Sequence, residues 1–146
     1  MAQITFPIVA GELTLAVLVN VGAQRAVDLI SAGQPVPRGV WVTESIDSGT
    51  TVSCVSRTVL RQLGLTPVGQ GTSQTASGPL VADVYRVSYS IPPYQNLPGP
   101  VLTRADTRVM ELATILPGMD MLIGMDLLLT VKTILDGPGG QFTIEF

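Results

Sequence analysis

The sequence predicts an all-β, barrel-like fold in a single domain. The chain has 146 residues, a length typical of one domain with a sizeable hydrophobic core. Its 15 glycines and 11 prolines divide it into short segments, most of them rich in β-branched and aliphatic residues. Many short strands separated by closely spaced turns are typical of a closed β architecture. One domain over residues 1–146, without internal repeats, is therefore expected.

The first part of the chain contains three predicted strands. They are segments rich in β-branched and aliphatic residues: Ile4–Ala10, Leu13–Val21 and Val40–Ile46. A turn at Gly11-Glu12 joins the first two, and the prolines of segment 34–37 place a loop before the third.

Two short segments have helical spacing. Ser56–Leu63 has its apolar residues on one face and stops at a glycine, which predicts a short helix. Ala23–Gly33 is ambiguous, because Val27, Leu29 and Ile30 are compatible with a short helical turn.

The second part of the chain predicts two hairpins. Val68–Thr75 and Leu80–Ile91 flank the small residues Ala76-Ser77-Gly78-Pro79, and Val131–Leu135 and Phe142–Phe146 flank Gly137-Pro138-Gly139-Gly140. Between the hairpins we expect a proline-rich loop at Pro92–Pro100 and one or two strands within Val101–Leu116. A short buried strand at Met121–Ile123 and a helical turn at Asp126–Thr130 should follow.

Composition excludes several classes of function. Eight Lys and Arg against eleven Asp and Glu give a net charge of −3, so no basic patch is available for nucleic-acid binding. The chain has no histidine and a single cysteine, Cys54, which excludes Ser-His-Asp triads, histidine-based metal sites and an intramolecular disulfide. No metal and no cofactor are expected, and any catalysis must come from carboxylates, hydroxyls or the backbone.

No segment of the sequence predicts export or membrane insertion. The N-terminal segment 1–22 lacks a basic region, and Glu12 interrupts its apolar run. Leu112–Leu129 is broken by Pro117, Asp120 and Asp126, so it falls short of a membrane span. We therefore expect a cytoplasmic protein with a reduced cysteine and no membrane partner.

The most informative segment is Glu44-Ser45-Ile46-Asp47-Ser48-Gly49-Thr50-Thr51. It places a carboxylate at the end of an apolar strand, followed by a hydroxyl, a glycine and another hydroxyl. An ordinary Asx turn after a strand would explain this triplet taken alone. The segment also resembles the catalytic turn of aspartic proteases, which reads apolar-Asp-(Ser/Thr)-Gly-(Ala/Ser/Thr).

Three further features resemble retropepsin-like aspartic proteases, and they occur in that family's order. Ser56–Leu65 resembles the short helix that ends in Leu-Gly-Leu, and Thr75, Ala76, Ser77 and Gly78 lie where the family carries its flap. Near the end, Ile123 and Gly124 resemble the apolar-Gly segment that packs beside the catalytic turn. Segments 32–39 (AGQPVPRG) and 136–146 (DGPGGQFTIEF) are most similar to bacterial single-domain retropepsin-like proteins.

The resemblance implies an aspartic endopeptidase. Its fold would be a single-lobe, closed retropepsin-like barrel with a flap hairpin and one or two short helices, functional as a symmetric homodimer. Asp47 would be catalytic, and Ser48 would bond across the dyad to the opposite subunit. Gly49 would allow close approach of backbone and substrate. Thr50 can donate a hydrogen bond to Asp47, which favours the ionised carboxylate and predicts an acidic pH optimum.

The second catalytic aspartate must come from a second copy of the chain. The other six aspartates have the wrong neighbours, and the nearest, Asp106-Thr107, is followed by Arg108 in place of glycine. A two-lobed, pepsin-like enzyme needs about twice this length. The terminal segments Gln3–Pro7 and Gln141–Phe146 are expected to contribute strands to the dimer interface, as termini do in related proteins.

The sequence departs from the retroviral pattern at two linked positions. Thr51 and Met125 stand where retroviral enzymes carry an acidic residue and an arginine that form an ion pair. Both partners are missing together, so the catalytic interpretation survives, but the retroviral account of dimer stability does not. The alternatives are a catalytically weak retropepsin fold that binds peptides or acts as a scaffold, and an unrelated β-barrel interaction domain.

Several single residues carry smaller expectations. Trp41 is expected to pack in the structure and Cys54 to be a small buried residue. The carboxylates of Asp120 and Asp126 could form a glycosidase pair, but they are expected to cap or flank the turn around Gly124. The apolar residues Ile46, Val81 and Ile123 are expected to line the cleft and to favour hydrophobic side chains beside the cleaved peptide bond.

Overall fold

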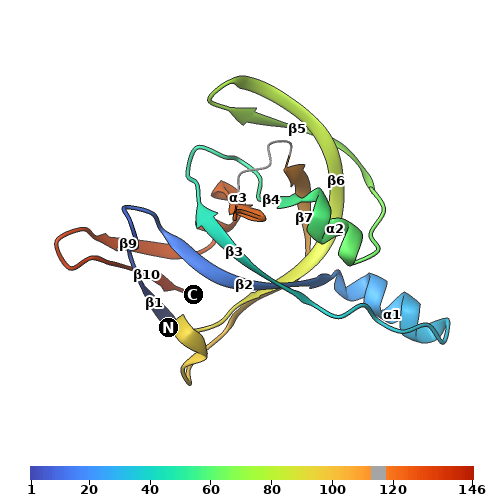
Figure 1. The fold of residues 1–146 in the computed structure, drawn as a ribbon, viewed down its shortest axis with the longest axis horizontal. Helices are drawn as coiled ribbons and strands as arrows, with labels where there is room; N and C mark the ends of the chain where they lie inside the picture. The colour runs from blue at the N-terminus through green and yellow to red at the C-terminus, as the bar shows by residue number, and fades with distance from the viewer. Residues whose placement is uncertain (113–117) are drawn as a thin grey trace.

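Six strands form a closed barrel in this computed structural model, which describes residues 1–112 and 118–146. Neighbours around the barrel are β2 (Thr14–Val21), β3 (Val40–Ile46), β8 (Met121–Ile123), β4 (Cys54–Ser56), β7 (Leu102–Leu112) and β6 (Gly78–Ile91), and β6 pairs back with β2 (Figure 1). The β3–β8 and β4–β7 pairs are parallel. The expected barrel-like β fold is therefore confirmed.

Strand β4 was missed by the sequence analysis. It is only three residues long, all of them buried, and it runs directly into a helix. Its partners are β7 and β8, which lie more than 50 positions away, at Met110 and Leu122 for example. A strand of this length has no periodicity of its own, so only its distant partners define it.

The hairpin of β5 (Gly69–Thr75) and β6, which contains the residues expected to form a flap, extends beyond the barrel. Strand β5 pairs with the first half of β6, and the tip is reduced to Ala76 and Ser77. The hairpin arches over the loop that joins β3 to β4 (Figure 1). The proline-rich loop after β6 contains a short 3₁₀ helix, η1 (Tyr94–Asn96).

The two ends of the chain form a second, three-stranded sheet. Its order is β1 (Gln3–Pro7), β10 (Gln141–Glu145) and β9 (Lys132–Asp136). The rings of Phe6 and Phe142 stack across it, with centroids 5.2 Å apart. The expected first strand is too long, because Ala10 and Gly11 have positive φ values and turn the chain.

This sheet shows how the two termini are arranged within one chain. Both terminal segments, which the sequence analysis expects at a dimer interface, pair with each other from Gln3↔Glu145 to Pro7↔Gln141. Strand β10 also pairs with β9 on its other side, so among the described residues it has no free edge. A strand added to this sheet by a second copy would have to join β1 or β9.

The helices lie on the outside of the sheets. Helix α1 (Ala23–Ser31) is a full helix in which Ala26 packs against the core and Leu29 is buried, whereas Val27 and Ile30 are 54% and 66% exposed. The segment that the sequence left ambiguous is therefore helical, as its apolar spacing allows, and Val27 and Ile30 face away from the core. Helix α3 (Met125–Leu128) follows β8 directly.

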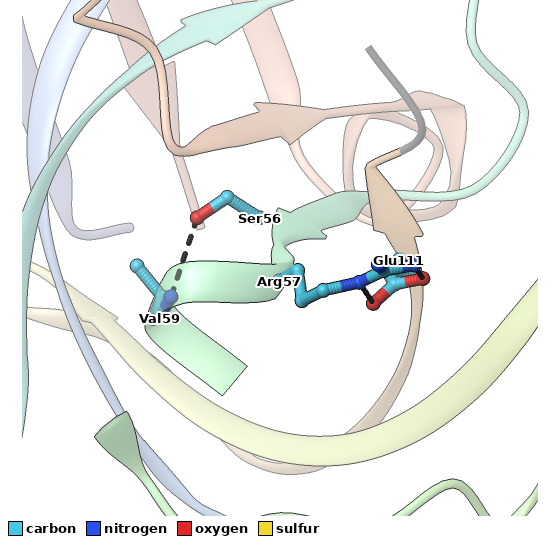
Figure 2. A network of polar contacts seen from close by, with 4 residues as sticks. All are labelled: Ser56, Arg57, Val59 and Glu111. Carbon is cyan, nitrogen blue, oxygen red and sulfur yellow. Dashed lines mark hydrogen bonds and ion pairs between the residues drawn. The ribbon is translucent and has the colours of Figure 1, made fainter. Parts of the chain in front are cut away.

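The expected short helix is present as α2 (Arg57–Gln62), which is capped at its start and bonded to the barrel. Ser56 is the N-cap residue, and its hydroxyl accepts a hydrogen bond from the Val59 N–H at 3.3 Å. The Arg57 guanidinium donates to both carboxylate oxygens of Glu111 on β7, at 2.7 and 3.0 Å (Figure 2). A bidentate pair of this kind orients the start of the helix against β7.

Burial corrects two further expectations. Trp41 is 54% exposed on β3, since its neighbours Val40 and Val42 turn toward the interior. Ile123 is completely buried in the core, so it cannot line a cleft in this chain. Cys54 is buried, as expected.

The expected strand Val101–Leu116 ends at Leu112, and its last four residues lie outside the described part. Among the described residues, no helix has the length and apolar character needed to cross a bilayer.

Candidate active site

Asp47 lies at the end of β3, where the strand meets β8. Ile46 pairs with Ile123 in the parallel β3–β8 ladder, and the Asp47 N–H donates to the Ile123 carbonyl at 2.9 Å. This ladder determines where the carboxylate emerges, because the next residues, Ser48 and Gly49, already belong to an exposed turn. Asp47 itself is half-buried.

Both oxygens of the Asp47 carboxylate accept hydrogen bonds from their own turn. The Gly49 N–H donates to Oδ1 at 2.9 Å, and the Thr50 hydroxyl donates to Oδ2 at 3.0 Å. A Cβ atom on residue 49 would lie 3.1 Å from Oδ1, a tight contact that glycine avoids. The hydrogen bond expected from Thr50 is therefore present, and the turn holds the carboxylate in one orientation.

Gly124 lets the chain after β8 pack against this turn. A Cβ at this position would lie 2.6 Å from the Thr50 carbonyl oxygen. The close approach allows the Met125 N–H to donate to the Thr50 carbonyl at 2.8 Å and the Asp126 N–H to the Thr51 carbonyl at 3.1 Å. The structure thus brings Ile123 and Gly124 together with the Asp47 turn.

A network centred on Ser53 strengthens this junction and was missed by the sequence analysis. The buried Ser53 donates its hydroxyl to Asp126 Oδ1 at 2.7 Å and its N–H to Asp126 Oδ2 at 3.1 Å. Its hydroxyl also accepts from the Gly124 N–H at 3.1 Å. Gly124 and Asp126 lie 71 and 73 positions from Ser53 in the chain, so no local signal in the sequence could reveal these hydrogen bonds.

The other aspartates near the site have structural contacts. Asp120 accepts a hydrogen bond from the Ser56 hydroxyl at 2.9 Å, and Asp126 binds Ser53 as described above. Both therefore flank the turn around Gly124, as expected. Asp106 lies 3.7 Å from Arg86 and next to Gly22, at the N-terminus of α1, where a carboxylate is favourable.

The residues expected to form the flap lie at the end of the β5–β6 hairpin. Thr75 pairs with Gly78, whose φ of 112° suits glycine, and Ala76 and Ser77 form the exposed tip. Below the tip, the hydroxyl of Ser73 on β5 forms a 3.1 Å hydrogen bond with the hydroxyl of Thr51. The flap strand therefore contacts the segment that carries Asp47.

Two buried ionisable groups lie close to the site. Glu44, three residues before Asp47, is 1% exposed, and neither carboxylate oxygen has a hydrogen-bond partner among the described residues. Burial raises the pKa of Glu44 well above its ordinary value. Burial, together with the charges of Asp126 and Asp47, raises the pKa of the Cys54 thiol to about 11. The thiol is therefore protonated at neutral pH and is not a nucleophile.

The described residues contain no cluster of three His, Cys, Asp or Glu side chains that could hold a metal ion. The hydrogen bonds around Asp47 instead come from backbone N–H groups and hydroxyls. Such a turn can orient a carboxylate toward a water molecule, a substrate or a second carboxylate.

The six-stranded barrel, the flap hairpin and the turn beside β8 together define a retropepsin-like fold. The chain is similar to the crystal structure of a retropepsin-like aspartic protease from Rickettsia conorii, with a TM-score of 0.54 and 15% sequence identity. The alignment covers 97% of this chain and 89% of the Rickettsia chain. No family model matches the chain, and no curated protein matches it in sequence. The similarity is thus one of fold.

Proposed function

We propose that the chain is one subunit of a homodimeric aspartic endopeptidase and that Asp47 is its catalytic residue. The observation that carries this proposal is the turn itself. In a retropepsin-like fold, an Asp-Ser-Gly-Thr segment lies at the end of β3, with Gly49 and Thr50 donating to the two carboxylate oxygens. A purely structural Asx turn could occur in any fold, whereas this turn lies in a retropepsin-like one.

The reaction needs two such carboxylates close together. Because two carboxylates in contact cannot both ionise, they share one proton. The ionised carboxylate removes a proton from a water molecule, and the resulting hydroxide adds to the peptide carbonyl, which the protonated carboxyl polarises. The tetrahedral intermediate then breaks its C–N bond. A carboxyl proton passes to the leaving amine, so the products are one carboxylic acid and one amine.

The second carboxylate is proposed to be Asp47 of a second copy of this chain. The nearest other candidates have structural contacts: Asp106 lies beside Arg86, and Asp120 and Asp126 bind serine side chains. Dimerisation about a two-fold axis would bring two identical turns together. Ser48 is exposed beside Asp47 and would reach the opposite subunit across that axis.

The proposed substrates are peptides or proteins with hydrophobic side chains next to the cleaved bond. Val81, which is 63% exposed on the flap hairpin, and the half-buried Ile46 provide apolar surface near the turn. The hydroxyl of Thr50 donates to the Asp47 carboxylate, and the proposed pH optimum is acidic.

Turnover of a mixed peptide library, followed by mass spectrometry over a series of pH values, tests the proposal. The wild-type chain should cleave peptides at acidic pH, and Asp47→Asn should abolish cleavage while the protein stays folded. A statine-type transition-state mimic should bind the wild type. Binding of the mimic without any Asp47-dependent turnover would support the alternative, a peptide-binding or scaffold module. If the chain neither bound the mimic nor cleaved peptides, both the protease and the peptide-binding module would be excluded.

A further inference from the structure

The contact between the flap strand and the Asp47 segment is made by two hydroxyls. Ser73 on β5 is only 1% exposed, whereas its neighbours Thr72 and Gln74 are exposed. Its side chain therefore points to the inner side of the hairpin, where its hydroxyl meets the hydroxyl of Thr51 at 3.1 Å. This hydrogen bond joins residues 22 positions apart.

The two sides of this bond differ in how firmly they are held. The Thr51 carbonyl accepts from the Asp126 N–H at 3.1 Å and the Thr50 carbonyl accepts from the Met125 N–H at 2.8 Å, so Thr51 is tied to α3. Strand β5, in contrast, is the outermost strand of its sheet and pairs only with β6 in the described part of the chain. The hydrogen bond therefore connects an outer strand to a well-supported turn.

We propose that Thr51 and Ser73 form a latch that holds the flap at a defined position above Asp47. The two are positioning residues, because the Asp47 oxygens accept from Gly49 and Thr50 and not from the latch. The proposed catalytic consequence rests on the proposed function. The structural consequence, a flap that opens more readily when the latch is lost, does not.

The latch predicts a specific pattern of local opening. Losing one hydrogen bond of ordinary strength should increase the opening equilibrium of the hairpin about fivefold. Because the two hydroxyls bind each other, the double variant should open no more than either single variant. The remainder of the barrel should be unaffected, since neither residue belongs to its buried apolar core.

Hydrogen exchange of the full chain without ligand tests this pattern. Thr51→Val and Ser73→Ala, singly and together, should each increase exchange of the hairpin amides 69–80 about fivefold, without additivity. Thr72→Val, an exposed neighbour on the same strand, is the matched control and should change nothing. Unchanged exchange in both single variants, or additive increases in the double variant, would overturn the latch.

Kinetics on a peptide that the wild type cleaves test the catalytic consequence. Both single variants should raise KM about fivefold with little change in kcat, and the pH profile should stay in place because Asp47 keeps its hydrogen bonds. A shifted pH profile would show that the pair acts on the carboxylate and would overturn the positioning role. Faster hairpin exchange in variants of a chain that has no Asp47-dependent turnover would refute the proposed function and leave the latch standing.

Discussion

Thr50 follows the motif glycine in this turn, at a position where many retroviral enzymes carry alanine. Here Thr50 donates to Asp47 Oδ2 at 3.0 Å and is itself 7% exposed. A hydrogen bond of this kind stabilises negative charge on a carboxylate. In a dyad that works with one shared proton, this stabilisation moves the whole bell-shaped rate profile toward acid.

Thr50→Ala is therefore predicted to move the pH profile of kcat/KM toward neutral by about half to one pH unit. This shift corresponds to the loss of a hydrogen bond worth about 1 kcal/mol. Thr50→Ser keeps the hydroxyl and should leave the profile close to that of the wild type. Superimposable wild-type and Thr50→Ala profiles would mean that Thr50 does not act on the catalytic carboxylates.

The burial of Glu44 predicts how the free energy of unfolding depends on pH. Its folded-state pKa is raised by burial, so the unfolded chain releases the Glu44 proton at a lower pH than the folded chain does. The stabilisation is fully present below the unfolded value of 4.5 and is lost as the pH rises toward the folded pKa. In that window the free energy of unfolding should fall by about 1.4 kcal/mol per pH unit through this group.

Glu44→Gln should remove this dependence, because the amide does not ionise. Thermal unfolding of both proteins across a pH series is the measurement. The variant should become increasingly more stable than the wild type as the pH rises above 4.5. Below 4.5 the pH-dependent part of this stability difference should vanish. Glu12→Gln, at an exposed position, is the control and should leave the curve unchanged. A constant difference between wild type and Glu44→Gln would contradict the prediction.

At the scale of elements, the junction of β8 and α3 supports the Asp47 turn through Gly124. A methyl group there would lie 2.6 Å from the Thr50 carbonyl and 3.1 Å from the Val52 carbonyl carbon, both of them backbone atoms that cannot swing aside. Gly124→Ala should therefore cost about 1–3 kcal/mol of unfolding free energy, as overpacking does.

Urea denaturation measures this cost, and Gly69→Ala provides the control. A Cβ on Gly69 would meet nothing within 4 Å, so that substitution should stay within about 0.5 kcal/mol of the wild type. Equal stabilities for Gly124→Ala and Gly69→Ala would show that the turn and β8 can separate without penalty.

The flap hairpin is the element expected to respond to a ligand. Its small tip residues allow close backbone contact with a bound peptide, as a closing loop requires. Gln74–Pro79 should become protected from hydrogen exchange when an active-site inhibitor of the statine type saturates the protein. Unchanged protection of this segment at saturation would contradict its assignment as a flap. The latch variants provide a second check, because they should bind the inhibitor more weakly.

At the scale of the whole molecule, one chain provides one Asp-Ser-Gly turn, so the proposed dyad requires a dimer. Sedimentation velocity over a concentration series should show a monomer–dimer equilibrium, and specific activity should rise with the dimer fraction. Since β10 lies in the middle of its sheet, a strand-mediated contact at the terminal sheet would use the edge of β1 or β9. A strictly monomeric protein with Asp47-dependent activity would refute the shared dyad.

Local patterns predicted most of the elements. Strands β3 and β8 have the expected bounds, α2 lies within the expected helix and starts at its serine cap, and the glycine-rich turn joins β9 to β10. Helix α1 was predicted only as a possible short helical turn, and the structure extends it over Ala23–Ser31 with Val27 and Ile30 in solvent. The exposure of Trp41 was also not foreseen, since alternation along a strand does not say which face is covered.

The sequence by itself determined the local chemistry of this protein. The order of Asp47, Gly49 and Thr50 in one turn defines which groups can donate to the carboxylate, because these hydrogen bonds span only two or three residues. Only the tertiary structure decided what surrounds that turn. Several features depend on segments that are far apart in the chain. They are the Ser53–Asp126 network, the Thr51–Ser73 contact, the burial of Glu44 and the pairing of the termini. Such contacts depend on the closure of the barrel and have no signature in local sequence.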